Sequence, residues 1–210
     1  MPRLAGLGAV QMITEPVAAA THYTATQELA EGDIVTVYDL GGGTFDAAVL
    51  QWRDGVMHIL GDAEGVEWLG GSDFDEAVIS YVDQELNGRV AALDPRDEQA
   101  ALTLSRLRQE CVLAKEALSF DEETTIPVFM PYSYENVRLS RATFEKLVEP
   151  AVNSTVEALH RALNSANVKP ADLSGVLLVG GSSRIPLVAR AVEAAMGRPT
   201  MMDAHPKHAV

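Results

Sequence analysis

Residues 37–46 read Val37-Tyr38-Asp39-Leu40-Gly41-Gly42-Gly43-Thr44-Phe45-Asp46, and this stretch contains the pattern that decides the fold. β-Branched and aromatic residues on both sides of three glycines predict two strands joined by a tight turn. Because the chain doubles back at that turn, we expect Asp39 and Asp46 to come close together. Consecutive glycines also let backbone amides approach a ligand without hindrance from a Cβ atom.

A pair of carboxylates beside such a turn suits a magnesium-bound phosphate. Mg²⁺ keeps several of its waters and takes few protein ligands, so two aspartates are enough to hold it. Thr44 adds a hydroxyl at the same turn. In the alternative interpretation the glycines only serve the turn of an ordinary hairpin. The paired aspartates and the threonine favour the phosphate site.

A second glycine motif lies near the end of the chain, where residues 176–186 read Val-Leu-Leu-Val-Gly-Gly-Ser-Ser-Arg-Ile-Pro. An apolar strand here leads into a glycine pair at the start of a helix, where free amides and the helix dipole favour an anion. Arg184 can pair with a phosphate or lie flat against an aromatic base. Taken alone, the motif also suits simple packing of a strand–helix corner.

The other elements alternate between strands and helices, which predicts an α/β protein. The expected strands cover 34–38, 45–52, 56–60, 124–130, 134–139 and 176–179. The expected helices cover 74–86, 97–118, a long segment after Ser140 with Leu147 in its buried stripe, and 186–196. Ser72 or Asp73 is the expected N-cap of the first of these helices. We expect 62–140 to form a smaller α+β unit inserted into a core made of 1–61 and 141–210.

Charge and cysteine content exclude several classes of function. The chain has 210 residues with 30 Asp and Glu against 16 Lys and Arg, a net charge of −14, which disfavours nucleic acid and anionic membranes as partners. No apolar run approaches the roughly 18 residues of a membrane span. Cys111 is the single cysteine, so an internal disulfide and a Cys-rich zinc site are excluded. Without the apolar core of a signal peptide, the expected setting is cytoplasmic.

Three further features of the sequence bear on function. The five histidines show no zinc spacing. Cys111 falls on the apolar face of its helix and is interpreted as a core residue. Trp68, beside a glycine pair, is either a surface contact for partners or an ordinary packing residue.

Together these motifs resemble the Hsp70 (DnaK-type) chaperones, members of the actin-like ATPase superfamily with an RNase H-like α/β fold. The resemblance covers nearly the whole chain, but only the second lobe of that family's nucleotide-binding domain, subdomains IIA and IIB. The segments that carry it are 15–20 (Glu-Pro-Val-Ala-Ala-Ala), 39–46, 69–75 (Leu-Gly-Gly-Ser-Asp-Phe-Asp) and 178–186.

The resemblance implies a site for ATP or ADP with Mg²⁺. Asp39 and Asp46 would hold the Mg²⁺ through water and orient the attacking water, with a contribution from Glu15. The β- and γ-phosphates would contact Gly41, Gly42, Gly43 and Thr44. The adenosine side would be lined by Gly180, Gly181, Ser182 and Arg184, and the opposite rim by Gly70 and Gly71. Lys115 and Ser119 match the family's ribose- and base-contacting positions.

Four residues depart from the family pattern at the nucleoside end. Val112 stands where the family usually has Glu, and Glu116 where it has a basic residue that packs on the adenine. Each change removes a contact worth on the order of 1–3 kcal/mol. Lys207 and His208 replace two acidic residues in the final segment. In the alternative interpretation of the helix around Lys115, its Lys and Ser only form a solvated face.

We therefore expect the second lobe of an Hsp70-like stress-response ATPase whose complete protein supplies a first lobe and a client-binding domain. A nucleotide-exchange factor or a J-type co-chaperone would be a partner of that protein. The isolated lobe should hydrolyse little ATP, because half of the phosphate site would be missing. The alternative is a degenerate Hsp70-like regulatory or interaction module. A sugar-kinase or cell-shape relative is a third possibility, which the continuous Hsp70-like segments disfavour.

Overall fold

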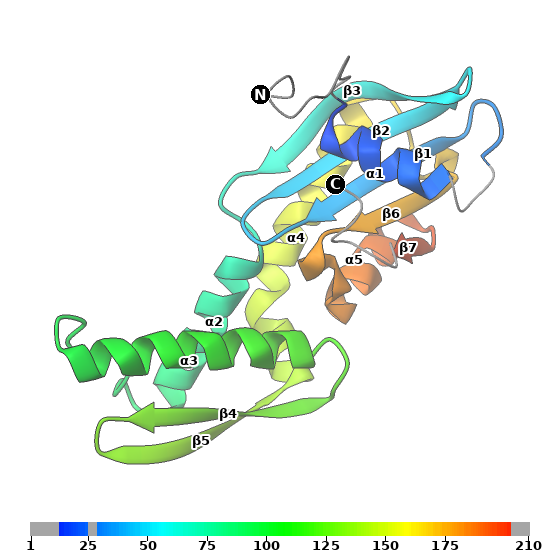
Figure 1. The fold of residues 1–210 in the computed structure, drawn as a ribbon. Helices are drawn as coiled ribbons and strands as arrows, with labels where there is room; N and C mark the ends of the chain where they lie inside the picture. Colours follow the sequence, from blue (N-terminus) through cyan, green and yellow to red (C-terminus); the bar gives the residue numbers. More distant parts are fainter. Residues whose placement is uncertain (1–12, 25–28, 203–210) are drawn as a thin grey trace, which may run out of the picture.

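A computed structural model describes residues 13–24 and 29–202 of the chain. Its larger part is a five-stranded sheet with the order β3-β2-β1-β6-β7 (Figure 1). The strands are β1 (Ile34–Leu40), β2 (Phe45–Arg53), β3 (Val56–Val66), β6 (Gly175–Val179) and β7 (Thr200–Met202). β1, β2 and β3 form an antiparallel meander, whereas β6 pairs parallel to β1 and to β7. Lys207 and His208 lie outside the described residues.

The expected strands 34–38, 45–52 and 56–60 are confirmed, and the turn between the last two agrees with the sequence. Asp54 and Gly55 connect β2 to β3 with φ angles of 52° and 76°, the left-handed values that a tight hairpin turn requires. β3 continues six residues beyond its expected end, to Val66. Gly61 and Gly65 interrupt the apolar residues of this segment. Most of its side chains are exposed at the sheet edge, so the alternation of apolar and polar residues that predicts a strand is missing.

Helices cover both faces of the sheet. α4 (Arg141–Ser165) and α5 (Pro186–Met196) pack on one face, and α1 (Glu15–Thr24) lies on the other. Alternate residues of the central strand β1 serve the two layers: Tyr38 and Leu40 belong to the α4 side, and Val35 and Val37 to the α1 side. All four are fully buried, as expected for a strand covered on both faces.

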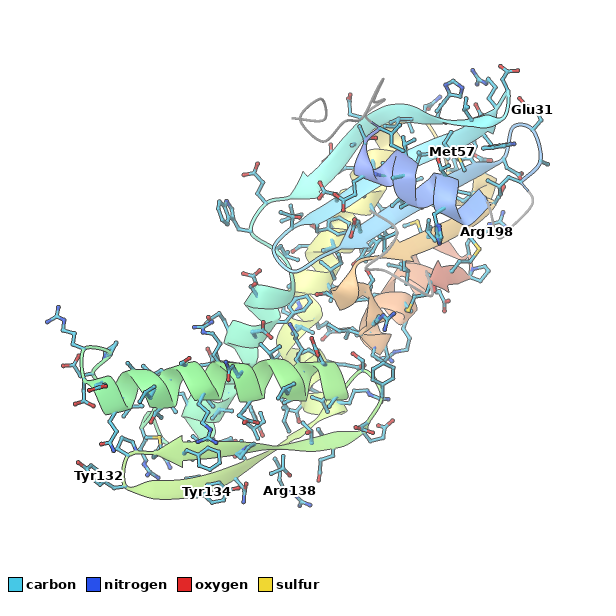
Figure 2. All side chains as sticks on the ribbon, in the orientation of Figure 1. Glu31, Met57, Tyr132, Tyr134, Arg138 and Arg198 are labelled. Atoms are coloured by element: carbon cyan, nitrogen blue, oxygen red, sulfur yellow. The ribbon has the colours of Figure 1, made fainter. Side chains whose placement is uncertain are left out.

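The smaller part consists of α2 (Gly71–Glu85), α3 (Glu98–Ala117), β4 (Glu123–Met130) and β5 (Ser133–Ser140). α3 lies across one face of the two-stranded β4–β5 sheet, and the buried residues of both strands pack beneath it in the main core cluster. The other face is open: Figure 2 shows Tyr132, Tyr134 and Arg138 projecting away from α3. Cys111 lies on the buried face of α3, and burial raises the pKa of its thiol to about 12, so its interpretation as a core residue is confirmed.

Two local expectations were wrong, and one short strand was not predicted. The N-cap of α2 is Gly70, not Ser72 or Asp73; the carboxylate of Asp73 instead accepts a hydrogen bond from the Gly70 N–H at 2.8 Å. Leu147 is 36% exposed, because it lies at the margin of the buried α4 stripe that runs through Val148 and Val152. β7 was not predicted, since three residues are too few to show a period of two.

Among residues 13–24 and 29–202, no helix combines the length and the apolar character needed to cross a membrane.

A close crossing between β3 and the end of α4 requires glycine at position 61. Gly61 has a φ of +65°, and a Cβ there would stand 2.4 Å from the Ala166 backbone nitrogen. We expect Gly61→Ala to lower the free energy of unfolding in a urea titration by about 3 kcal/mol. Gly55→Ala is the matched control: φ is +76° but the space is open, so about 1 kcal/mol is expected. Equal losses at the two positions would refute the steric role of the crossing.

Candidate functional site

Two aspartates lie side by side on the sheet, each flanked by a glycine. Asp39 on β1 is directly opposite Asp46 on β2, and Gly65 on β3 is opposite Asp46. On the other side, Gly180 follows directly after β6. A Cβ at Gly65 would lie 3.0 Å from Asp46 Oδ1, and one at Gly180 would lie 2.7 Å from Asp39 Oδ1. Glycine at positions 65 and 180 therefore leaves room for the carboxylates of Asp46 and Asp39.

Electrostatic repulsion is concentrated at this pair. The pKa of Asp39 is raised to about 6, first by burial and then by the negative charges of Glu15 and Asp46. Glu15 begins α1, which covers the sheet face toward which Asp39 points. The structure thus brings together the three acidic residues predicted from sequence, and their charges oppose one another unless a proton or a cation intervenes.

The glycine loop formed by residues 41–43 opens to solvent. The Gly41 N–H donates to the Thr44 carbonyl at 3.0 Å and closes the turn. Gly42, Gly43 and Thr44 are exposed, and a Cβ on Gly42 or Gly43 would meet no atom within 4 Å. Side chains therefore do not cover the loop, as a phosphate-binding role requires.

Two distant segments pack against the buried side of this loop. At the start of α2, the Gly71 N–H donates to the Gly41 carbonyl at 3.0 Å and the Ser72 N–H to the Gly42 carbonyl at 2.8 Å. From the turn after β6, the Ser182 hydroxyl donates to the Gly41 carbonyl at 2.9 Å. A Cβ on Gly70 would stand 2.6 Å from the Gly43 nitrogen, so this contact requires glycine at position 70.

Lys115 ties α3 to the start of α2. Its ammonium donates to the Gly71 carbonyl at 2.9 Å and pairs with Asp75 Oδ1 at 2.7 Å. Both charged side chains are largely buried, with 12% and 14% of their surface exposed. Lys115 is therefore not part of a simple solvated helix face. Its neighbour Val112 is half-buried, whereas Glu116 is exposed.

The remaining predicted residues lie in the turn after β6 and just beyond the end of α3. Ser182 and Ser183 are buried, Gly181 is exposed, and Arg184 is half-buried at the end of the short 3₁₀ turn after β6. The Arg184 Nε is buried and has no hydrogen-bond acceptor within the described part of the chain. Ser119 lies one turn beyond Lys115, and its half-buried side chain makes no hydrogen bond to the described residues.

Sequence reasoning missed two residues of this arrangement and left a third undecided. Gly65 was missed because β3 is longer than expected, and Asp75 entered only as the last residue of the 69–75 segment, without a role of its own. Trp68 is 86% exposed and adopts a left-handed φ of 61° just before the Gly70 turn. Its exposure excludes ordinary packing within the described chain.

Comparison with known proteins assigns the family. The family described as Hsp70 protein matches residues 2–210. The chain is 40% identical over 209 residues to a chaperone protein HscA homolog from Burkholderia thailandensis, covering 99% of the chain and 32% of that protein. An HscA homolog from Azotobacter vinelandii is 39% identical over 208 residues, or 99% of the chain and 31% of that protein.

The chain belongs to the Hsp70 family. The predicted family is thereby confirmed, and so is the predicted fold class, since the mixed sheet with helices on both faces agrees with an Hsp70 actin-like ATPase lobe. The chain spans about a third of the length of these Hsp70 relatives. The roles of individual residues remain predictions.

The donor set fits a hydrated cation better than a directly bound one. No group of three acidic, His or Cys side chains close enough to enclose a metal ion occurs in the described ranges. Two adjacent carboxylates that repel one another would be stabilised by a cation held through its waters. This arrangement agrees with the water-mediated Mg²⁺ site that the Hsp70 resemblance implies.

The raised pKa of Asp39 predicts a pH-dependent stability. Because the folded pKa of about 6 exceeds the ordinary 3.8, ionisation of Asp39 destabilises the fold as pH rises from about 4 to about 6. Asp39→Asn should therefore raise the free energy of unfolding at pH 7.5 by about 1 kcal/mol, a value discounted because the carboxyl is partly open to water. The gain should vanish below about pH 4.

Urea titrations of the 210-residue chain without divalent cations at a series of pH values measure this difference. Glu67→Gln, in the exposed turn after β3, is the control for loss of one negative charge. A stabilisation by Asp39→Asn that is equally large at pH 4 and pH 7.5 would contradict the assigned cause.

Proposed function

We propose that this chain forms one wall of a cleft that binds ATP or ADP with Mg²⁺, and that the complete Hsp70 protein couples ATP hydrolysis to conformational change as a chaperone. The observation that carries the proposal is the pairing of Asp39 with Asp46 beside an open loop of three glycines. The acids supply charge for a cation, and the exposed backbone amides of the loop supply hydrogen bonds for phosphate oxygens.

In this proposal the chain positions groups and balances charge. Asp39 and Asp46 hold the waters of the cation and orient the water that attacks the terminal phosphate, while Glu15 extends the acidic network. Mg²⁺ supplies positive charge that offsets the repulsion between these acids and between the phosphate oxygens. The Thr44 hydroxyl and the loop amides stabilise the negative charge that develops on the transferred group.

The nucleoside would lie between the turn after β6 and the helix α3. Arg184 supports this position because its buried Nε lacks an acceptor in the described ranges. Gly181 leaves open space at the same turn, since a Cβ there would meet nothing within 4 Å. Ser119, directly after the C-cap of α3, makes no side-chain hydrogen bond to the described residues, whereas Lys115 is already engaged by the Gly71 carbonyl and Asp75.

The arrangement of the complete protein is also part of the proposal. Residues 62–140 act as an inserted unit at the edge of the nucleotide site, on a core made of 1–61 and 141–210. A first lobe supplies the other wall of the cleft, and a client-binding domain uses the energy of hydrolysis. A nucleotide-exchange factor or J-type co-chaperone acts on this assembly in the cytoplasm.

Calorimetric titration of the complete protein with Mg·ATP tests the proposal. We expect micromolar or tighter binding, and Asp46→Asn should abolish ATP turnover because one of the two cation-holding carboxylates is lost. Asp62→Asn is the control, since Asp62 is exposed and only its backbone contacts Ser165. A titration without heat of binding, or normal turnover by Asp46→Asn, would refute the proposal.

A second candidate function is a regulatory or interaction module with weak nucleotide binding. Val112 favours it, because a valine at this place on α3 offers no hydrogen bond to a ribose. Glu116 favours it as well, because an exposed carboxylate cannot take the part of a cation stacked on a base.

Restoring a carboxylate at position 112 separates the two candidates. We expect Val112→Glu to raise the affinity for ADP about tenfold through hydrogen bonds to the ribose. The affinity for 2′,3′-dideoxy-ADP should not rise, because that analogue lacks the hydroxyl partners. If neither wild type nor Val112→Glu binds ADP in calorimetry, the interaction module is favoured.

A further inference from the structure

Hydrogen bonds to the carbonyls of the glycine loop set the direction of its backbone N–H groups. In a trans peptide the C=O and the N–H of one unit point in opposite directions, and no cis peptide occurs among the described residues. Any group that holds the carbonyl of Gly41 therefore also fixes the direction of the Gly42 N–H. The same holds for the Gly42 carbonyl and the Gly43 N–H.

The Gly41–Gly42 peptide is held by two donors. The Gly71 N–H at 3.0 Å and the Ser182 hydroxyl at 2.9 Å both reach the Gly41 carbonyl oxygen. Because both donors belong to segments packed behind the loop, the Gly42 N–H points to the open side. It has no acceptor within residues 13–24 and 29–202.

The Gly42–Gly43 peptide is held through a relay of two peptide units. Lys115 Nζ donates to the Gly71 carbonyl, which turns the Ser72 N–H of the same unit away from Lys115. That N–H donates to the Gly42 carbonyl at 2.8 Å, and the Gly43 N–H is thereby turned outward. Asp75, paired with Lys115 at 2.7 Å, fixes the start of the relay.

We propose that Ser182 and Lys115 are positioning residues that aim the Gly42 and Gly43 amides at the phosphate end of the nucleotide. The carbonyl clamp is the name we give to the donors Gly71 N–H, Ser72 N–H and Ser182 hydroxyl on the Gly41 and Gly42 carbonyls. This inference rests on the proposed nucleotide site and assigns Ser182 and Lys115 a role different from contact with the nucleoside.

The clamp matters because three glycines in a row are the most flexible backbone available to a loop. Free amides that sample many directions must be ordered when the phosphates bind, at a cost in conformational entropy. Hydrogen bonds that fix the carbonyls order the amides before the ligand binds and remove most of this entropic cost. Preorganised dipoles stabilise charge in other sites in the same way. The benefit is confined to ligands with phosphates.

Two neighbouring serines provide a matched test. Ser182 and Ser183 are both buried, but the Ser183 hydroxyl donates to the Val179 carbonyl, outside the loop. In the complete protein we expect Ser182→Ala to weaken ADP binding by about fivefold to tenfold in calorimetry. Binding of adenosine, which has no phosphate, should change less than about twofold. Ser183→Ala should leave both affinities unchanged.

Lys115→Met provides a second variant with the same expected pattern, because it releases the Gly71–Ser72 peptide. Hydrogen exchange in the 210-residue chain monitors the clamp without any ligand: the Gly71 amide should exchange faster in Ser182→Ala, and the Ser72 amide faster in Lys115→Met. Both variants should keep the circular-dichroism spectrum of the wild type. A variant that loses it is replaced by Ser182→Cys, or by Lys115→Met combined with Asp75→Asn, which avoids an unpaired carboxylate.

Each outcome decides the inference. Equal losses for adenosine and ADP in Ser182→Ala would show a direct nucleoside contact and overturn the positioning role. Unchanged ADP affinity would overturn it as well, while leaving the proposed function intact if wild type binds ADP. Absence of ADP binding by wild type would overturn the proposed function together with this inference.

Discussion

The antiparallel pairing of β1 with β2 is the constraint on which the rest of the structure depends. It places Asp39 directly opposite Asp46, so that two like charges share one face of the sheet at the distance of a cross-strand pair. The register cannot shift by one residue, because Val37 and Tyr38 are buried on opposite faces and would exchange environments. The buried sheet thus enforces a repulsive contact that its own stability disfavours.

The glycines around this contact fall into two physical groups. Gly42 and Gly43 face open space, whereas Gly70, Gly71 and Gly180 are sites where a Cβ would come within 3 Å of another segment. The second group lets the start of α2 and the turn after β6 close against the loop. Segments about 30 and 140 positions away in sequence therefore form its rear wall, and the first group remains free on the open side.

Strong local signals account for the part of the fold that the sequence predicts. The bounds of α5 agree with the expectation because Pro186 fixes its first turn and Gly197, with a φ of 61°, ends it. The β1–β2 hairpin follows from apolar runs around the glycines. By contrast, the strand end at Gly65 and the three-residue β7 have no periodic pattern to reveal them.

The site shows the same division between local and long-range information. Asp39, Asp46 and the glycine loop form one short motif, so their proximity could be predicted. The pairing of Lys115 with Asp75 could not, because both residues read equally well as helix-surface charges until α2 and α3 are placed side by side. The contacts from Gly71 and Ser72 are made by backbone N–H groups, so the side chains at these positions do not indicate them.

Two features around the loop share one explanation. Asp39 is partly buried beside two other acids, and two adjacent loop amides on the open side lack partners in the described ranges. A cation alone would relieve Asp39 but leave the amides without an anionic acceptor. A phosphate alone would accept from the amides but be repelled by the acids. A phosphate that carries its own Mg²⁺ meets both requirements, which is the physical reason for proposing Mg·ATP or Mg·ADP here.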